Sequence, residues 1–502
     1  PDIAKPAAES DVHQADAAAA LAAPSAIHLD GAVAIAPETF DPVFARYVRR
    51  SLTRSDLVSL TREVTDIYRA QGYFLSRAVI PPQTVSNGVL TIRIEEGRFA
   101  AVEFVGGGRE FQDFFAQLLA EVPARRATLE RAILTLGDLG GVTVLSSETV
   151  PVTDTRGEYK LVLKIETSSA DGQLYLDNRG EGGETPQLSA QAGFNGLGVP
   201  GSRVEVSVFT DPGDPARRQF AEVSASAPLG LRGTIVSASA SASNAVDGQF
   251  GAGRYRSRGT DVALGLKHPV VRTRAHSMWV NLELVQSNSD ASIETLGLRR
   301  DELSMARLGA SWDIRDDWGG RNRLNLSVTF GRDGFAAPTP AHPMARTDDG
   351  ASFTKFTLLA SRTQRLGADW SIFASVRGQY SEDNLPEDEE ISFGGARWGR
   401  AFDYGEIEGD TGAAGQLELR YTRTGLSLAE SLQGYVFADT AATWVRAGEG
   451  EPDSMSSAGI GLRAAFAGGY RAGVETAVPL DRVPNGKDGR DPRLFATVSK
   501  EF

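Results

Sequence analysis

The chain has 502 residues, with 52 Lys and Arg against 65 Asp and Glu, so its net charge is −13, and it has no cysteine. The acidic balance argues against a general nucleic-acid binder, which needs a basic face to neutralise phosphates. The missing thiols exclude disulfides, cysteine nucleophiles, iron–sulfur clusters and cysteine-type zinc sites. The length suggests about three domains of roughly 150 residues each, or one large barrel or sandwich.

Residues 1–26 are rich in alanine, contain three prolines and show no fixed apolar period. We expect a tail here, with a weak helix over 9–23 as the alternative, because an isolated helix of this length is marginal in water. The first residue is Pro1 and not Met, so we expect a processed chain from which any signal peptide has been removed.

Residues 27–97 and 98–168 predict two α+β modules of similar layout. In the first module, apolar residues spaced three and four apart predict a helix, and two alternating segments around the turn at Asn87-Gly88 predict strands. The second module gives the order strand, helix, helix, strand, strand. The expected helices are 54–71, 110–121 and 129–139, and the expected strands are 76–80, 89–95, 101–105, 142–150 and 159–166. Two tandem copies of this order indicate duplicated modules.

From residue 169 to the end the helical period disappears. About sixteen segments of roughly ten residues alternate apolar and polar positions, as Val204, Val206 and Val208 do, which predicts an antiparallel membrane β-barrel. A soluble sandwich or propeller is the alternative, but the region shows no repeat period. The last segment ends in Phe502, and a terminal aromatic residue on a final barrel strand is the expected outer-membrane sorting signal.

The sequence carries no motif for catalysis, metal binding or a cofactor. The five histidines lack a ligand spacing, and neither a nucleophile elbow nor a phosphate-binding loop is present. We therefore predict that the protein is not an enzyme and binds no metal or cofactor. Acidic clusters at 313–317 and 387–390 are interpreted as solvated loop charge, with a calcium site as the alternative.

One connection, 382–412, is unusually long for a loop between two strands. Its residues 397–404 include two arginines and three large aromatic residues in a glycine-rich stretch, which a loop needing only solubility would not carry. We predict that it folds into the barrel lumen and presents Arg400 to an inward carboxylate. The candidate partner is Asp439, which shares a strand face with Phe437. In the alternative, Arg400 lies on the rim and Asp439 faces lumen water.

The segment FGGARWGRAF resembles the sixth-loop motif of the two-partner secretion transporters, the TpsB family of filamentous-haemagglutinin and haemolysin type within the BamA-like superfamily. The loop motif falls on Arg400, Ala401 and Phe402. The barrel motif Phe-x-Asp-x-Gly falls on Phe437, Asp439 and Ala441. Ala401 and Ala441 stand where the family pattern has glycine, so the docking of the loop is open at these positions. In the family the loop arginine pairs with the aspartate.

The resemblance extends to the N-terminal half. YRAQGYFLSRAVIPPQ (68–83) and GVLTIRIEEG (88–97) are similar to a first POTRA module, and LERAILTLGDLGGVTV (129–144) is similar to a second one. GQLYLDNRGEGG (172–183) looks like the first barrel strand. The resemblance therefore implies a tail or weak plug helix at 1–26, POTRA 1 at 27–97, POTRA 2 at 98–168 and a barrel at 169–502.

By this resemblance the chain is an outer-membrane transporter whose periplasmic POTRA domains capture an unfolded, TpsA-like exoprotein, which the barrel exports. Its other expected partners are outer-membrane lipids and the barrel assembly machinery, and no nucleic acid. Capture by strand addition needs an exposed sheet edge. One possible edge is 142–150, with Val142, Val144 and Leu145. The alternatives are a small-solute diffusion channel and an assembly factor for other barrels.

Overall fold

A computed structural model describes residues 23–153, 155–180, 185–250, 253–294, 296–334, 352–446 and 451–502. Most of the predicted tail or plug helix at 1–26 therefore falls outside the described residues. The chain forms two compact units, Pro1–Asp138 with Val142–Thr167, and Leu139–Gly141 with Ser168–Phe502. Among the described helices, none is both long and apolar enough to span a bilayer.

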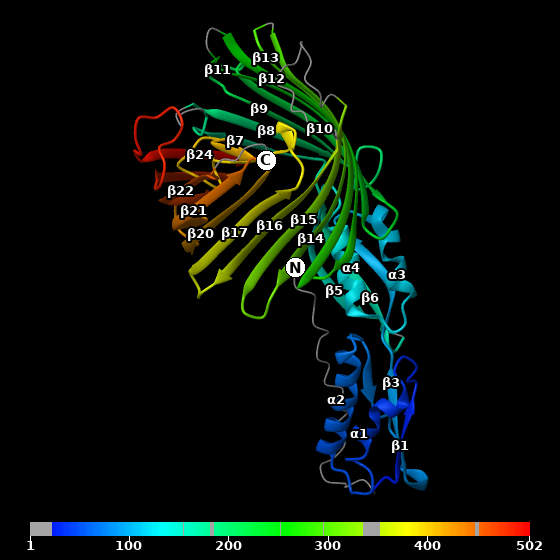
Figure 1. Ribbon diagram of the computed structural model, residues 1–502. Helices are drawn as coiled ribbons and strands as arrows, with labels where there is room; N and C mark the ends of the chain where they lie inside the picture. The colour runs from blue at the N-terminus through cyan, green and yellow to red at the C-terminus, as the bar shows by residue number, and fades with distance from the viewer. Residues whose placement is uncertain are drawn as a thin grey trace. The chain divides into compact units, whose positions relative to one another are not determined.

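The first module is a three-stranded sheet in the order β1-β3-β2, covered by helices (Figure 1). The prediction missed β1 and the short helices before α2, which are too short to show a period. Leu60, Val64 and Tyr68 of α2 are fully buried against Leu90 and Ile92 of β3. The elements are β1 (Ala26–Asp30), η1 (Pro37–Phe40), α1 (Asp41–Phe44), α2 (Arg54–Ala70), β2 (Arg77–Val79), η2 (Ser86–Gly88) and β3 (Val89–Glu95).

The second module repeats the arrangement with sheet order β4-β6-β5. The predicted helix over 110–121 is wrong in its first half, where a 3-10 helix runs before a short α-helix. Gly108 precedes it in the left-handed region (φ 89°) and has no side chain to cap an α-helix. The elements are β4 (Arg98–Val105), η3 (Arg109–Phe115), α3 (Ala116–Ala120), α4 (Arg126–Leu136), β5 (Val142–Pro151) and β6 (Glu158–Thr167).

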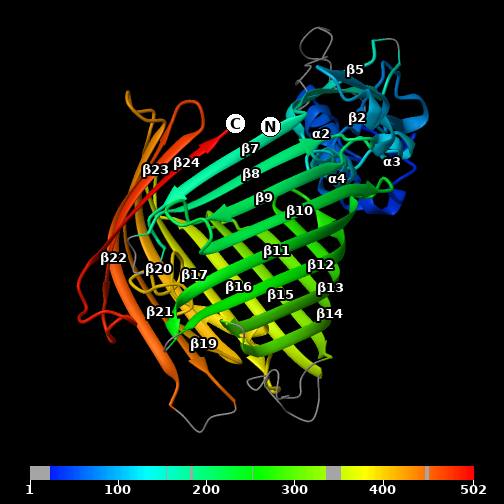
Figure 2. The ribbon, with the colours of Figure 1, turned by 90° about the horizontal axis from the view of Figure 1, so that it is seen from above.

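The second unit is a closed antiparallel barrel of sixteen strands, in which β24 pairs with β7 (Figures 1 and 2). The expectation of ten-residue strands is wrong for β11 to β14, which have 17 to 20 residues. The strands are β7 (Ala170–Asp177), β8 (Gln187–Asn195), β9 (Arg203–Thr210), β10 (Arg218–Leu229), β11 (Thr234–Phe250), β12 (Gly253–Arg272), β13 (His276–Ile293), β14 (Leu296–Arg315), β15 (Gly320–Asp333), β16 (Ser352–Arg365), β17 (Trp370–Ser381), β20 (Thr411–Thr424), β21 (Ser431–Trp444), β22 (Asp453–Phe466), β23 (Tyr470–Pro479) and β24 (Arg493–Glu501).

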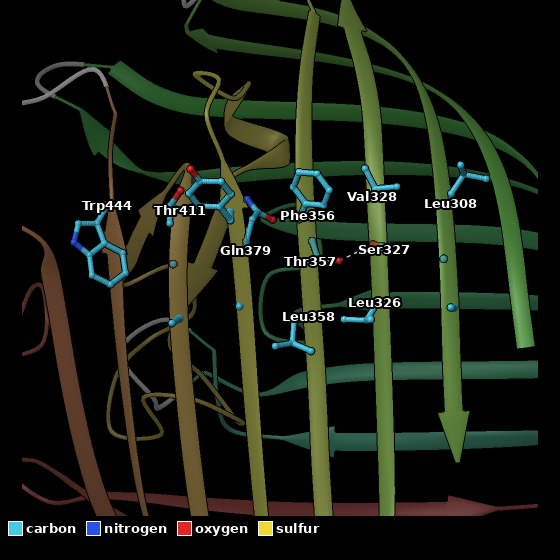
Figure 3. Close-up of a pocket in the computed structure, with 16 residues that line it drawn as sticks. Leu308, Leu326, Ser327, Val328, Phe356, Thr357, Leu358, Gln379, Thr411 and Trp444 are labelled. Carbon is cyan, nitrogen blue, oxygen red and sulfur yellow. Dashed lines mark hydrogen bonds between the residues drawn. The ribbon is translucent and has the colours of Figure 1, made fainter. Parts of the chain in front are cut away.

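Side chains alternate between the two faces of the barrel wall. Figure 3 shows Leu326, Phe356 and Leu358 lining an apolar groove on the outward face. Ser327 follows Leu326 on its strand, and Thr357 separates Phe356 from Leu358. The hydroxyl groups of Ser327 and Thr357 share a hydrogen bond of 2.6 Å. This alternation explains why a chain with a mean hydropathy of −0.22 forms an apolar exterior.

The long connection between β17 and β20 lies inside the ring of strands (Figure 2). It begins with the 3-10 helix η5 (Glu387–Glu389) and continues into a small hairpin of β18 (Ile391–Phe393) and β19 (Ile407–Gly409). The residues between β18 and β19, 394–406, form the tip of the loop. The motif residues Arg400, Ala401 and Phe402 therefore lie at the tip of the loop, beyond the hairpin.

Candidate functional site

The loop tip is a compact turn that presents Arg400. The Gly394 amide donates to the Trp398 carbonyl (2.9 Å), and the Gly395 amide donates to the Phe402 carbonyl (3.0 Å). A Cβ on Gly394 would lie 1.8 Å from the Asp403 carbonyl oxygen, so only glycine fits there. These close backbone contacts hold the Arg400 side chain in one direction.

The Arg400 guanidinium is buried among acidic side chains of the barrel wall. It lies 2.6 Å from Glu418 of β20 and 3.1 Å from Glu475 of β23, with 3% of the side chain exposed. It also donates to the Gln416 side chain and stacks on the Phe437 ring, 4.0 Å from the ring centroid. A buried cation needs such partners, because desolvation of an unpaired charge is costly.

The predicted partner Asp439 holds the backbone of the tip more closely than the guanidinium. Its Oδ1 accepts the Gly399 amide (2.7 Å) and the Ser457 hydroxyl (2.5 Å). Its Oδ2 lies 3.6 Å from Nε of Arg400, which is an ion pair but not a hydrogen bond. The structure therefore brings Arg400 and Asp439 together, with Glu418 and Glu475 as closer partners of the arginine.

The register of the barrel strands brings together the wall residues that contact the Arg400 side chain, which we call its seat. They are Gln416, Glu418, Phe437, Asp439 and Glu475. Glu418 of β20 lies opposite Phe437 of β21, and Phe437 lies opposite Gly459 of β22. A Cβ on Gly459 would lie 2.6 Å from the Phe437 ring, so the ring occupies space that any other residue at position 459 would fill. The ring then forms the surface on which Arg400 stacks.

Two further arginines contact the tip, Arg179 in the connection after β7 and Arg493 at the start of β24. Arg179 pairs with Glu475 (2.6 Å) and donates to the Arg400 carbonyl (3.4 Å). Arg493 donates to the Ala401 carbonyl (2.9 Å) and pairs with Asp403 (2.5 Å). The tip is thus held through its backbone carbonyls as well as its charged side chain.

The other motif residues lie in an apolar cluster between the loop and the wall. Ala401 and Phe402 are 0% and 1% exposed, and Ala441 on β21 is 2% exposed. Ala401 does not have positive φ, so alanine meets the backbone requirement where the family pattern has glycine. The buried members are Ile391, Phe393, Trp398, Ala401, Phe402, Ile407, Ala414, Tyr435, Phe437, Ala441, Met455, Ala477 and Phe495.

A family model described as "Haemolysin secretion/activation protein ShlB/FhaC/HecB" matches residues 161–464, and a model described as "POTRA domain, ShlB-type" matches residues 23–97. The chain belongs to the ShlB/FhaC/HecB family. The predicted resemblance and fold class are thereby confirmed: an outer-membrane barrel of sixteen strands follows two POTRA domains, which lie in the periplasm. Members of the family are secretion transporters.

Relatives of this ShlB/FhaC/HecB-family chain match over most of its length. It is 23% identical over 470 residues to the heme/hemopexin transporter protein HuxB of Haemophilus influenzae, covering 89% of this chain and 81% of that protein. It is 25% identical over 490 residues to the outer membrane transporter CdiB of Escherichia coli, covering 91% and 79%. The solved structure of CdiB from Escherichia coli shares the fold, with a TM-score of 0.78, 22% identity and coverage of 98% and 92%.

Sequence reasoning missed several charged residues of the seat. Glu418 and Glu475 stand at the polar positions of normally alternating strands, so they lacked the signal that pointed to Asp439, a carboxylate that breaks an apolar stretch. Glu418 also pairs with Arg420 (2.5 Å) and Arg463 (3.2 Å), so the seat is a network and not a single pair. Arg179 and Arg493 carried no such signal, because arginine near a strand end is common on any rim.

The three residues predicted on the POTRA 2 edge do not share one face. Within the described residues β5 pairs with β6 alone, so its other side is an open edge. Val142 is buried and Val144 is partly buried, whereas Leu145 is 44% exposed. The register shifts between Val144 and Ser146, so Leu145 lies in a bulge. Substrate binding at this edge stays a prediction.

Phe502 follows β24, and its side chain is 69% exposed. Its amide donates to the Gly172 carbonyl (2.9 Å), which continues the pairing of β24 with β7. Its role in sorting stays a prediction. Over the part of the chain that the structure describes, no three His, Cys, Asp or Glu side chains form a group that could hold a metal ion.

Proposed function

We propose that the POTRA domains bind an unfolded partner exoprotein by strand addition, and that the barrel passes it to the cell surface under the control of the loop tip. The observation that carries the proposal is the seat of Arg400, where a loop inside the lumen places a buried cation against carboxylates from three strands. A loop fixed in this way limits the lumen until the tip leaves its seat.

The open edge of β5 supports the capture step. An extended chain can pair its backbone with this edge, and the exposed Leu145 side chain offers an apolar contact beside it. The relatives HuxB and CdiB are named as transporters, and we extend export of a protein partner to this chain by proposal. We further propose that outer-membrane lipids contact the outward face and that the barrel assembly machinery inserts the barrel. No cofactor, catalysis or nucleic acid enters this proposal.

Deletion of the gene, followed by comparison of surface and medium proteins, tests the transport step. We expect one secreted protein to be lost and to be restored by the wild-type chain but not by Arg400→Ala. Arg397→Ala is the matched control, because Arg397 lies on the same tip with its side chain exposed. If no secreted protein is lost, or if Arg400→Ala restores it fully, the proposal is wrong. Loss of many barrel proteins instead indicates an assembly factor.

A photo-crosslinking residue tests the capture step. We expect a crosslinker at Leu145 to trap the secreted protein that deletion identifies. The matched position is Val105, which lies on the opposite edge strand β4 and has the same exposed fraction of 44%. Crosslinks from Val105 alone would assign capture to the other edge of the sheet.

A further inference from the structure

The acidic segment at the start of the loop is an anchor to the barrel wall. Its interpretation as solvated charge is wrong for Glu389, of which 5% is exposed. One carboxylate oxygen of Glu389 accepts Arg307 of β14 (2.8 Å), and the other lies 2.6 Å from Nζ of Lys355 on β16. Lys355 also donates to the Glu389 carbonyl (2.8 Å). Arg307 and Lys355 face Thr329 of β15 from either side, so they occupy one row of the wall.

A second contact of the same kind lies on β14. Arg299, which is buried, pairs with Glu387 (2.7 Å) and lies 3.5 Å from Asp388. Its Nε also lies 3.1 Å from the neighbouring Asp301. The three acidic residues of η5 therefore meet three cations of the wall, and none of these cations belongs to the seat of Arg400.

An apolar contact accompanies these ion pairs. Leu385 of the loop is 0% exposed and packs against apolar side chains on the lumen face of the wall. Residues that line a barrel lumen are normally polar, so an apolar patch there needs a covering group. Leu385 covers it. The wall residues are Val285, Leu303, Met305 and Phe353.

The base of the loop is braced across its two limbs. Gln379 of β17 donates to the Glu389 carbonyl (2.9 Å) and to the Asp410 carbonyl (3.3 Å). The Asp410 carboxylate accepts the Leu385 amide (2.6 Å) and the Arg446 amide (2.8 Å). The outgoing limb, the returning limb and the barrel wall are therefore tied together below the hairpin.

Glycines separate this base from the tip. Gly394 directly follows β18 and has φ of +123°, and Gly405 lies just before β19 with φ of +73°. Both positions lie in the region of backbone space that glycine enters freely. A backbone change at these two points would move residues 394–406 without moving the braced base.

We propose that the ion pairs of Glu387 and Glu389 with the wall, the Leu385 contact and the Gln379–Asp410 brace form a stem anchor that stays closed during transport, and that only the tip leaves its seat. Glu389, Arg307, Lys355 and Arg299 are then positioning residues, which hold the loop base against β14–β17. The exoprotein passes on the side of the lumen that the tip vacates. This inference rests on the proposed role of the tip in transport.

Engineered disulfides test the anchor, because the chain has no cysteine of its own. The stem lock joins Leu385→Cys to Leu303→Cys, Met305→Cys or Phe353→Cys, whichever pair closes. The tip lock joins Ala401→Cys to Ala441→Cys or Ala477→Cys, which share one buried cluster. Closure is read from the shift in gel mobility that reductant reverses, and barrel folding is read from heat-modifiable mobility.

With the stem lock closed, we expect secretion within about twofold of wild type, with or without reductant. With the tip lock closed, we expect secretion to fall by more than about tenfold and to return on reduction. If the closed stem lock blocks secretion and reductant restores it, the anchor opens in transport and the inference is wrong. If the closed tip lock leaves secretion unchanged, the proposed function itself fails, so the two failures are distinguishable.

A charge variant tests whether the anchor positions the loop. Glu389→Gln leaves Lys355 and Arg307 without their shared carboxylate, whereas Asp388→Asn removes the same charge at an exposed position of η5. In planar bilayers we expect Glu389→Gln to raise the fraction of time spent in open states several-fold, and Asp388→Asn to match wild type. Addition of the stem lock should return Glu389→Gln to the wild-type level. Equal behaviour of the two variants would contradict a positioning role for Glu389.

Discussion

The POTRA modules and the barrel place charge and apolar surface in opposite ways. In the second module Lys160 and Glu103 pair at 3.0 Å, with 43% and 52% of their side chains exposed. In the barrel lumen Arg400 and Glu418 pair at 2.6 Å, with 3% and 2% exposed. Exposed pairs contribute little to stability, whereas a buried charge that loses its partner is costly. Loss of an ion pair should therefore cost much less free energy at the POTRA surface than in the barrel lumen.

Apolar side chains show the reverse arrangement. Leu60 of the first module is fully buried in a core, while Leu264 on the outward face of β12 is 58% exposed within the protein. Leu60 is removed from water by its neighbours in the chain, whereas Leu264 has no such cover within the protein and, as proposed above, contacts membrane lipid. Matched substitutions in the two regions thus measure how much each kind of contact contributes to the free energy of unfolding of its unit.

The largest expected effect is that of Arg400→Glu, which adds a carboxylate to a seat that already holds three. We expect docking of the tip to lose more than about 3–5 kcal/mol, the range for breaking a buried ion pair. Ala401→Cys reports on docking, because position 401 is 0% exposed when the tip is seated. Maleimide labelling of this cysteine should be slow in the wild-type background and fast with Arg400→Glu.

Arg400→Lys is the matched variant for this comparison. It keeps the charge but lacks the planar fork that contacts Glu418 and Glu475 together. We expect labelling at an intermediate rate. Slow labelling in the Arg400→Glu background would show that the apolar cluster alone seats the tip, and the contrast between buried and exposed ion pairs would then fail.

A smaller effect is expected from truncation of the POTRA core. Leu60→Ala should reduce the stability of the first module by about 2–5 kcal/mol, because it leaves a cavity among packed residues. Hydrogen exchange of α2 in the full chain measures this loss. Leu264→Ala should leave the exchange of β12 near wild type, since lipid fills the space. Equal losses at both positions would contradict the reversed arrangement of the two regions.

Loss of a surface pair should have less effect again. Lys160→Gln removes the partner of Glu103, and we expect a change of no more than about 1 kcal/mol. Hydrogen exchange of β4 and β6 measures it, at low and at high salt. Because the pair is exposed, salt should abolish any difference between the variant and wild type. A loss that persists at high salt would show that Lys160 acts through packing of its stem.

Periodicity alone predicted most of the fold. The sixteen barrel strands and α2 were predictable because each repeats its pattern over several residues, which a burial pattern enforces. β1 was not, because a five-residue strand such as Ala26–Asp30 carries too few alternations to stand out from the alanine-rich segment before it. The extra length of β11 to β14 was also missed, since their outer ends lose the apolar alternation on which the prediction depended.

The site was predictable only in part. Arg400 and Asp439 stood out because each interrupts an apolar or glycine-rich pattern. The role of Glu389 could not be predicted, because burial of a loop carboxylate depends on which wall residues face it. Lys355 and Arg307 are 48 residues apart in sequence (355 − 307 = 48) and share a row only through the register of three strands. Such pairings appear only when the barrel is closed.

The smallest expected effect is the pH dependence of the α2 cap. Asp56 accepts the Thr53 hydroxyl (2.7 Å) and the Thr53 amide (2.8 Å) and pairs with Arg50 (2.7 Å), and these contacts lower the pKa of the carboxyl from 3.8 to about 2. Because the folded pKa lies below the unfolded value, the stabilisation is present above pH 4 and is lost as the pH falls toward 2. Hydrogen exchange of the first turn of α2, corrected for the intrinsic rates, should show this loss. Asp56→Asn has no charge to lose, so its protection should stay level across the same range. An equal pH slope in both proteins would assign the effect to another group. It would mean that the charge of Asp56 does not stabilise the cap of α2.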